Sequence, residues 1–311
     1  MSISNTRELE PIINKVLELA KAQGASEAEA DIGVGSGLSA TVRMRELEKI
    51  EHERDKAMHI TVYMDGRKGS SSTSDFNLDS LKKSVEAACA IAAHTSVDDC
   101  AGLVDAELMA TEFPELDLYH PWNISPEEAT ELAIDCETLA LDADDRITNA
   151  DGTLVTTYSG SHLYANSHGF CNGWDWSSHT VDCTVIAKTE NGMQRDGWYS
   201  KHCDSNSLES IEAIAKESAR RCVNRLDAKK LTTRNVPVIY EATVSSSLFS
   251  PFITAISGGS LYRQASFMLD KKGEKIFADH ITLSEDPHRL KALGSAPFDN
   301  DGVATKARDI V

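Results

Sequence analysis

The sequence has little positive charge and no long apolar run. Of its 311 residues, 31 are Lys or Arg and 49 are Asp or Glu, which gives a net charge of −18. So acidic a chain is not expected to present the basic face that binds nucleic acid or an anionic membrane surface. No apolar stretch approaches the roughly 18 residues that a membrane-spanning helix needs. These deficits exclude two broad classes of protein and favour a soluble globular one.

Paired cysteines and a secretion signal are also lacking. The cysteine count is odd and no CxxC motif occurs, so free thiols in a reducing cytosol are the simplest interpretation. Residues 1–10 contain neither the basic nor the apolar region of a signal peptide. We therefore expect a cytoplasmic protein. The seven cysteines are Cys89, Cys100, Cys136, Cys171, Cys183, Cys203 and Cys222.

Apolar spacing and helix-start signals predict five helices. Asn5 or Thr6 is expected to cap the first, and Ser74 or Asp75 the second. The third has the strongest start, because Ser125 is followed by Pro126 and by Glu128 at the capping-box position. The helices are expected to begin at residues 6, 76, 126, 208 and 243, and the last is stopped by a glycine pair.

Alternating apolar and polar residues predict strands, and turn dipeptides predict hairpins between them. Helices and antiparallel hairpins therefore mix irregularly, which is typical of an α+β fold rather than a doubly wound sheet. The expected turns are Gly33–Gly37, Asp65-Gly66, Asn166–Gly169 and Asn191-Gly192. The expected strands are 30–34, 38–44, 58–64, 68–73, 155–165, 170–187, 236–240 and 275–283.

The length exceeds that of one typical domain. We expect an N-terminal α+β domain over 1–96, a connector over 97–124 and a central α+β meander domain over 125–230. Residues 235–311 are expected to start a β-rich C-terminal domain. Because the last of these residues carry no capping signal, we expect that domain to be truncated.

Catalytic motifs are mostly absent. The two histidines nearest to a zinc-protease pattern, His52 and His59, are seven residues apart, whereas ligands on one helix must lie about one turn apart. They also lie in a strand-like segment. Gly33, Gly35 and Gly37 follow a strand but have GxGxG spacing, so a hairpin turn is favoured over a phosphate loop. Neither a P-loop nor a GxSxG motif occurs.

Residues 162–203 collect side chains that can bind zinc. Their spacing matches no standard zinc module, so a metal site, ordinary surface or packing histidines and a peptide-contact surface all stay open. Two residues, His179 and Cys183, would share one face of a strand. The set comprises His162, His168, His179, His202, Cys171, Cys183 and Cys203, with Trp174, Trp176, Trp198 and Tyr199 in the same hairpins.

The most distinctive string runs from Ala255 to Arg263 and contains a glycine pair between an apolar helix and a polar stretch. It is either a helix stop with a tight crossing or a loop that faces a ligand or another subunit. On the second interpretation, the candidate peptide or subunit contacts are Ser257, Gly258, Gly259, Ser260, Tyr262 and Arg263.

Together these strings identify a resemblance to the TldD/PmbA family, on its PmbA (TldE) side. The resemblance covers nearly the whole chain and is most specific between Ile256 and Gly302. Its strings are Ser39–Arg43, Asp65–Gly69, Ser72–Asp75, Ala255–Arg263, Phe267–Asp270, Glu285–His288, Gly294–Asp299 and Gly302.

The resemblance implies a two-domain fold with an incomplete C-terminal β-rich domain, in a cytosolic two-subunit metalloprotease that processes or degrades peptides. In the metal-bearing TldD subunit a helix carries HExxxH and binds zinc. The equivalent residues here, 241–248, contain no histidine. We therefore assign no catalytic residue, metal ligand or cofactor to this chain, and expect zinc in a TldD-type partner.

The resulting expectation is a non-catalytic subunit that pairs with a TldD-type zinc subunit, or with itself, and shapes a chamber for peptide substrates. It is not expected to contact nucleic acid or membrane. Two alternatives remain open: a stand-alone peptide- or protein-binding module, and an autonomous metalloenzyme that uses the His/Cys set at 162–203.

Overall fold

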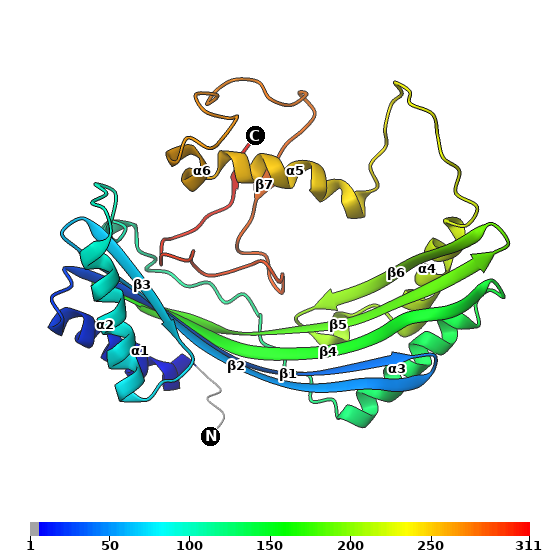
Figure 1. Cartoon of the computed structure of the whole chain (residues 1–311), viewed down its shortest axis with the longest axis horizontal. Helices are drawn as coiled ribbons and strands as arrows, with labels where there is room; N and C mark the ends of the chain where they lie inside the picture. Colours follow the sequence, from blue (N-terminus) through cyan, green and yellow to red (C-terminus); the bar gives the residue numbers. More distant parts are fainter. Residues whose placement is uncertain (1–5) are drawn as a thin grey trace. The chain divides into compact units, whose positions relative to one another are not determined.

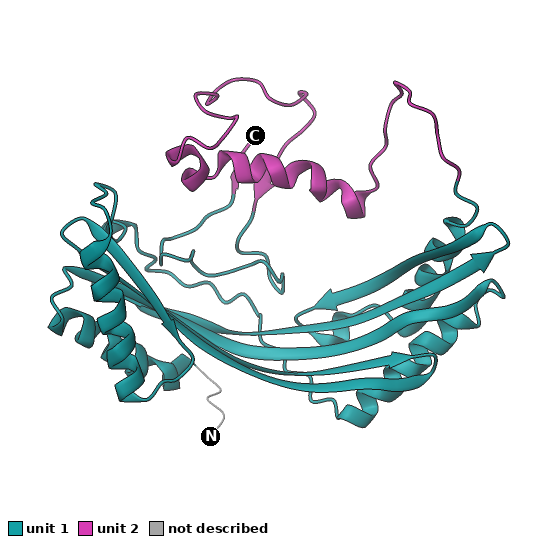
Figure 2. Ribbon diagram, viewed as in Figure 1, with its two compact units in different colours: residues 1–228, 286–307 teal, residues 229–285, 308–311 magenta. Residues whose placement is uncertain are grey.

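The computed structural model describes residues 6–311, so the predicted cap Asn5 lies outside the described residues. The chain divides into two compact units, which are coloured separately in Figure 2. Unit 1 comprises residues 1–228 and 286–307, and unit 2 comprises residues 229–285 and 308–311. No helix among the described residues is long and apolar enough to cross a membrane.

Unit 1 is built on a curled six-stranded antiparallel sheet with the order β3-β2-β1-β4-β5-β6 (Figure 1). The α+β fold class predicted from the sequence is confirmed. The strands are β1 (Glu27–Arg43), β2 (Glu46–Met64), β3 (Arg67–Thr73), β4 (Ile147–Asn166), β5 (Cys171–Thr189) and β6 (Gly192–His202). The α-helices of this unit are α1 (Thr6–Ala22), α2 (Leu78–His94), α3 (Pro126–Leu141) and α4 (Ile211–Asn224).

Two hydrophobic clusters hold the helices on one face of this sheet. One lies under α1 and α2 and includes Leu9, Ile32 and Ile60. The other lies under α3 and α4 and includes Val155 and Ile214. Because side chains alternate along a strand, the remaining residues of β1, β2, β4 and β5 point to the opposite face. That opposite face is where the site described below is built.

Local capping decides where several helices begin. At α3 the predicted capping box is present: the Ser125 hydroxyl accepts the Glu128 N–H at 3.1 Å, and the Glu128 carboxylate accepts the Ser125 N–H at 2.8 Å. The predicted cap of α2 is wrong, because Asn77 rather than Ser74 or Asp75 occupies the N-cap. The Asp75 carboxylate instead accepts hydrogen bonds from the Asn77 N–H and the Ser80 hydroxyl.

The predicted turn at Gly33–Gly37 is also wrong. These glycines lie in the middle of β1, which pairs without interruption with both β2 and β4. The hairpin bends instead at Met44 and Arg45, whose φ values are 53° and 66°. The carboxylate of Glu137, fully buried on α3, accepts the Arg45 N–H. A long-range contact therefore fixes a turn that no glycine marks.

The sheet joins the residues that the sequence assigns to the N-terminal and central domains, because β1 pairs along its length with β4. The connector between them is irregular apart from one 3₁₀ turn at Ala106–Leu108. Residues 286–307 belong to the same unit, where Phe298 is buried against Tyr164 in a third cluster.

Unit 2 contains α5 (Ala242–Ile256), α6 (Gly258–Tyr262) and a two-stranded pairing of β7 (Ser284–Glu285) with β8 (Arg308–Asp309). The predicted helix at 243–256 is confirmed. The predicted strands at 236–240 and 275–283 are wrong, because neither segment is a strand; of the second, only Leu283 bonds to the backbone beside β8. A strand forms only where a neighbouring strand can hydrogen-bond to its backbone N–H and C=O groups. An alternating apolar pattern does not by itself provide such a neighbour.

Candidate functional site

An aromatic surface crosses the middle of the sheet on the face opposite the four helices of unit 1. Tyr158 of β4 lies over β1, because Cβ atoms added at Gly35 and Gly37 would come within 2.5 and 2.3 Å of its ring. The ring stacks on Trp176 with centroids 5.6 Å apart, and its hydroxyl donates to Asp55 at 2.7 Å. The glycines of β1 therefore make room for an aromatic side chain instead of forming a turn.

Beside this surface lies a pocket of about 500 Å³. Trp174 and Trp176 of β5 line it on the sheet side, and His162 of β4 packs against Trp174 with ring centroids 4.7 Å apart. Residues 293–296 line the other side. Its volume lies within the range that is usual for ligand sites, about 300–1,000 Å³.

The 286–307 segment is held against the sheet by aromatic packing. The Phe298 ring meets Phe170 and Trp174 edge-on, with centroids 5.0 and 5.3 Å away. Edge-to-face pairs of this kind contribute about 0.5–1.5 kcal/mol beyond their buried area. The wall of the pocket is therefore anchored to the body of unit 1.

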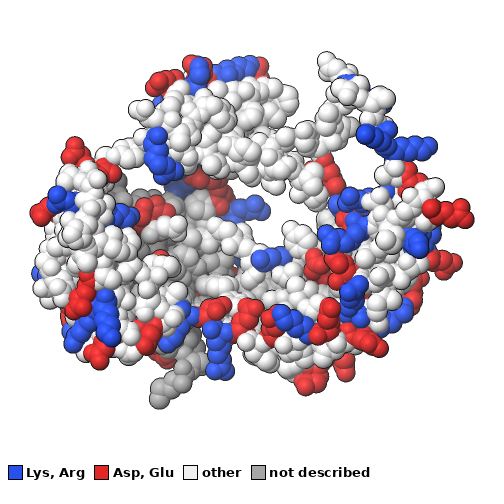
Figure 3. All heavy atoms as spheres, in the orientation of Figure 1, with Lys and Arg blue, Asp and Glu red and all other residues white. Residues whose placement is uncertain are grey.

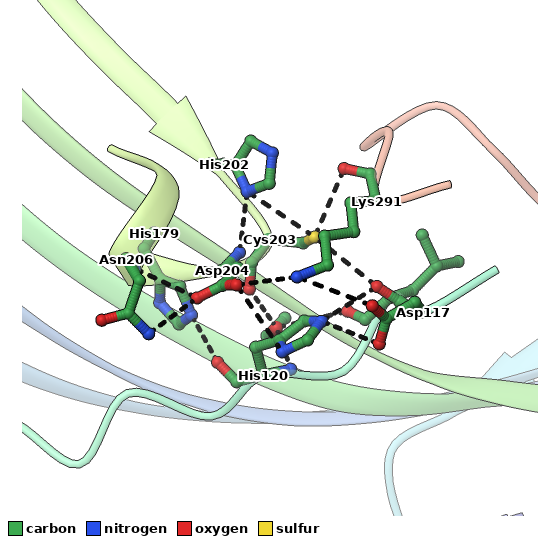
Figure 4. Close-up of polar contacts among 10 residues, drawn as sticks. Asp117, His120, His179, His202, Cys203, Asp204, Asn206 and Lys291 are labelled. Atoms are coloured by element: carbon green, nitrogen blue, oxygen red, sulfur yellow. Dashed lines mark hydrogen bonds and ion pairs between the residues drawn. The ribbon is translucent and has the colours of Figure 1, made fainter. Parts of the chain in front are cut away.

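A polar network ties the same segment to the end of β6 (Figure 4). The Lys291 ammonium lies 2.9 Å from the Asp204 carboxylate and 3.5 Å from that of Asp117. Asp117 also lies 3.0 Å from His120 Nε2. The network thus joins the connector, the end of β6 and the C-terminal segment of the unit.

The electrostatics of this network favour its charged form. The hydrogen bond from Lys291, followed by those from Asn206, lowers the pKa of Asp204 to about 2. Conversely, the hydrogen bond to Asp204 raises the pKa of Lys291. Both groups are therefore charged at neutral pH and pair with each other, so the network is a structural clamp rather than a proton-transfer site.

His179 is a fully partnered core histidine. Its Nε2 lies 2.8 Å from the His120 carbonyl oxygen, which can only accept, so Nε2 carries the proton. Nδ1 then accepts from the Thr157 hydroxyl at 2.9 Å. Burial lowers the pKa of His179, in keeping with this neutral form. Both ring nitrogens are used, which leaves His179 no lone pair for a metal.

The remaining members of the predicted His/Cys set do not form one cluster, although Cys203 Sγ lies 3.8 Å from His202 Nδ1 and Cys203 lines the same pocket as His162. Cys171 packs against the cluster under α1 and α2, whereas Cys183 is buried in the cluster under α3 and α4. His168 pairs with Glu27 at 3.0 Å in an exposed turn, and His202 Nδ1 accepts the Asp204 N–H at 3.0 Å. Within residues 6–311, no group of three or more His, Cys, Asp or Glu side chains could hold a metal ion.

His162 is the one histidine of the set that lines the pocket. Burial lowers its pKa, so the ring is neutral at physiological pH. Its Nδ1 is buried and has no hydrogen-bond partner. The sequence alone did not single out Tyr158 or Lys201 for this surface. The spacing of Trp174 and Trp176, which puts both on one strand face, was the available signal.

The predicted contacts at Ser257–Arg263 lie in unit 2, at the end of α5 and in α6. Ser257 ends α5, so the predicted helix stop is present, but the glycine pair begins α6 instead of forming an open loop. The Ser257 hydroxyl donates to the Thr254 carbonyl at 2.8 Å, and Tyr262 is 62% exposed. Their role as contacts stays a prediction.

Charge is mixed over the surface that Figure 3 shows. Lysines and arginines lie among carboxylates there and do not form one continuous basic surface.

Sequence models of three protein domains match the chain. They are domain 1, the central domain and the C-terminal domain of the PmbA/TldA metallopeptidases, and they match residues 28–92, 119–226 and 233–311. The chain is 43% identical over 305 residues to a metalloprotease PmbA homolog of Haemophilus influenzae, covering 98% of this chain and 67% of that protein. It is 41% identical over 303 residues to metalloprotease PmbA of Escherichia coli O157:H7, covering 97% and 67%.

Solved structures agree with these relatives. A Bacteroides thetaiotaomicron protein described as a candidate modulator of DNA gyrase superposes with a TM-score of 0.89 at 26% identity, over 98% of this chain and 70% of that one. TldE from Thermococcus kodakarensis superposes with a TM-score of 0.82 over 96% and 67%, and its 19% identity supports the fold alone. The chain belongs to the PmbA/TldD metallopeptidase family, as a member of the PmbA/TldE type.

Proposed function

We propose that this chain is the non-catalytic subunit of a cytoplasmic TldD/TldE-type metalloprotease. It would pair with a zinc-bearing TldD-type subunit, wall the chamber in which peptides are cleaved and hold an extended peptide there. The chain spans about two thirds of the length of its curated relatives, so the activity of the assembled enzyme is part of the proposal.

One observation carries the proposal. By family resemblance, the helix equivalent to α5 bears the zinc motif in the metal-bearing subunit. Here α5 reads ATVSSSLFSPFITAI and has no His, Cys, Asp or Glu. Zinc in proteins is bound by those side chains, and a catalytic site also needs a base to activate water. The residues present on α5 do not fit a zinc ion.

A structural role fits the remaining features. The face of the sheet opposite α1, α2, α3 and α4 presents Tyr158, Trp174 and Trp176 beside a pocket. Aromatic side chains give large contact areas at low cost in conformational entropy. Extended peptides are commonly held on sheet surfaces and edges, where pockets select their side chains. This chain would therefore contribute binding and orientation, while the partner supplies the hydrolytic chemistry.

The test is co-purification with the HExxxH-bearing paralogue of the same genome, followed by sizing and a peptidase assay. We expect a defined 1:1 complex whose activity is absent from either chain alone and is lost when the first histidine of the paralogue's motif is changed to alanine. Peptidase activity of this chain alone, or failure to form a complex, would contradict the proposal. Failure to form a complex would favour the stand-alone binding module.

A further inference from the structure

The pocket lies where the outer edge of β5 is no longer paired with β6. The two strands pair only between residues 179 and 189 of β5, so Trp174 and Trp176 lie beyond that ladder. The connector follows part of this edge, since the Ser177 N–H donates to the Leu118 carbonyl at 2.9 Å. Both residues line the pocket. The pocket is thus an opening between secondary-structure elements of one compact unit.

The pocket's lining is mostly uncharged. Two indoles and the neutral His162 ring supply flat aromatic surface, and Leu118 and Leu293 add aliphatic surface. Such walls match a large apolar or aromatic side chain, which gains about 25 cal/mol for each Å² that it removes from water.

One charged side chain, Lys201, interrupts this lining. Lys201 is exposed, and none of the ion pairs in the described part of the chain involves it. An unpaired ammonium beside an apolar pocket is complementary to a ligand with one apolar group and one negative charge.

Gly294 leaves space on the opposite side. A Cβ atom added there would meet no atom within 4 Å, so the backbone borders open volume. Gly294 lines the pocket together with Ser295. A larger side chain at position 294 can therefore begin without a clash at Cβ, and leucine there is expected to occupy part of the pocket.

We propose that this pocket binds the carboxyl-terminal residue of a peptide. The apolar or aromatic side chain lies against Trp174 and Trp176, and the α-carboxylate pairs with Lys201. The inference rests on the proposed function, because hydrolysis of a peptide bond leaves one product with a new α-carboxylate. A pocket for that group would retain the end of a cleaved or trimmed peptide.

The test is isothermal titration of the full chain with two probes, acetyl-Gly-Gly-Phe with a free carboxylate and the same peptide as its carboxamide. An exposed ion pair contributes about 0.2–1 kcal/mol, so the free acid is expected to bind up to about fivefold more tightly than the carboxamide. K201Q should abolish that preference. K188Q is the matched control, because Lys188 is an exposed lysine on β5 that does not line the pocket.

G294L should weaken binding of both probes, since the added side chain occupies part of the pocket, while the fold, followed by circular dichroism, is unchanged. The proposal is overturned if neither probe binds, if acid and amide bind equally, if K201Q keeps the preference, or if G294L binds normally. These titrations use no zinc subunit. If the chain forms an active complex but binds neither probe, only the inference about the pocket fails. If the chain binds the probes but forms no complex with the zinc subunit, only the proposed function fails.

Discussion

Ile60 and Ile239 are the same residue type in two very different parts of the molecule. Ile60 lies on β2 in unit 1 and is completely buried, whereas Ile239 lies in unit 2 and is 96% exposed. Both occur in apolar stretches that predict strands. The first stretch has strand partners on both sides and a helix layer above it, and the second has neither among the described residues. Apolar alternation indicates a strand only when a second strand is available to pair with it.

The comparison also shows that the segment with the most family-specific sequence is not the segment with the most buried residues. The strings that identify the family most clearly lie between Ile256 and Gly302. Unit 2, which holds many of them, buries only Phe252 and Ala255 of its described apolar residues. The clusters of buried residues, rich in Ala, Val and Ile, lie in unit 1 instead.

The largest expected effect comes from a matched pair of substitutions, one in each unit. Ile60→Ala removes a fully buried side chain and leaves a cavity, so it should reduce the free energy of unfolding by about 2–5 kcal/mol. Ile239→Ala should change it by less than about 0.5 kcal/mol. Urea unfolding of both variants measures the difference. Equal losses would mean that Ile239 is buried and that the contrast between the units does not hold.

A smaller effect is expected within β1. Gly35→Ala places a Cβ 2.5 Å from the Tyr158 ring, which cannot move freely because it stacks on Trp176 and binds Asp55. Overpacking of this kind should cost about 1–3 kcal/mol of unfolding free energy.

Gly33→Ala is the matched control for this strand, because its added Cβ meets nothing within 4 Å. Alanine is also the better strand residue, so this control should be neutral or slightly stabilising. If the clash with the ring is the cause, combining Gly35→Ala with Tyr158→Ala should remove most of the cost. An undiminished cost in the double variant would mean that the backbone of β1, not the ring, requires glycine.

The smallest expected effect is on how the free energy of unfolding depends on pH through the Asp204–Lys291 pair in unit 1. The folded-state pKa of Asp204 is lowered to about 2, below the ordinary 3.8. The carboxylate therefore contributes stability above about pH 4, and this contribution is lost as the pH falls from 4 towards 2. Unfolding of Asp204→Asn should accordingly depend less on pH in that window than unfolding of the unmodified chain.

The size of this change is limited because Lys291 is partly exposed and its pairing is screened by salt. Asp99→Asn, at an exposed carboxylate outside the clamp, serves as the control and should keep the parent slope. An identical slope for Asp204→Asn between pH 4 and 2 would show that the Lys291 pairing does not couple to folding.

Much of unit 1 could be predicted from the sequence because its signals are local. The capping box at Ser125 places α3, and the Asn191-Gly192 turn places the β5–β6 hairpin. The candidate site could be predicted only in part. The Trp174 and Trp176 pair was visible in the sequence, but the wall at residues 293–296 lies more than a hundred residues away in the chain. No pattern at short range can signal such a contact.

By itself, the sequence determined the helices, most of the hairpins, the membership of the family and the lack of zinc ligands on α5. These follow from residue types and short spacings. Only the tertiary structure decided that the glycines of β1 accommodate Tyr158, that Glu137 caps the turn at Met44 and Arg45, and that His179 is satisfied within the core. Each of these depends on which distant backbone or side chain fills the neighbouring space. That is a property of packing and strand pairing, which residue spacing does not encode.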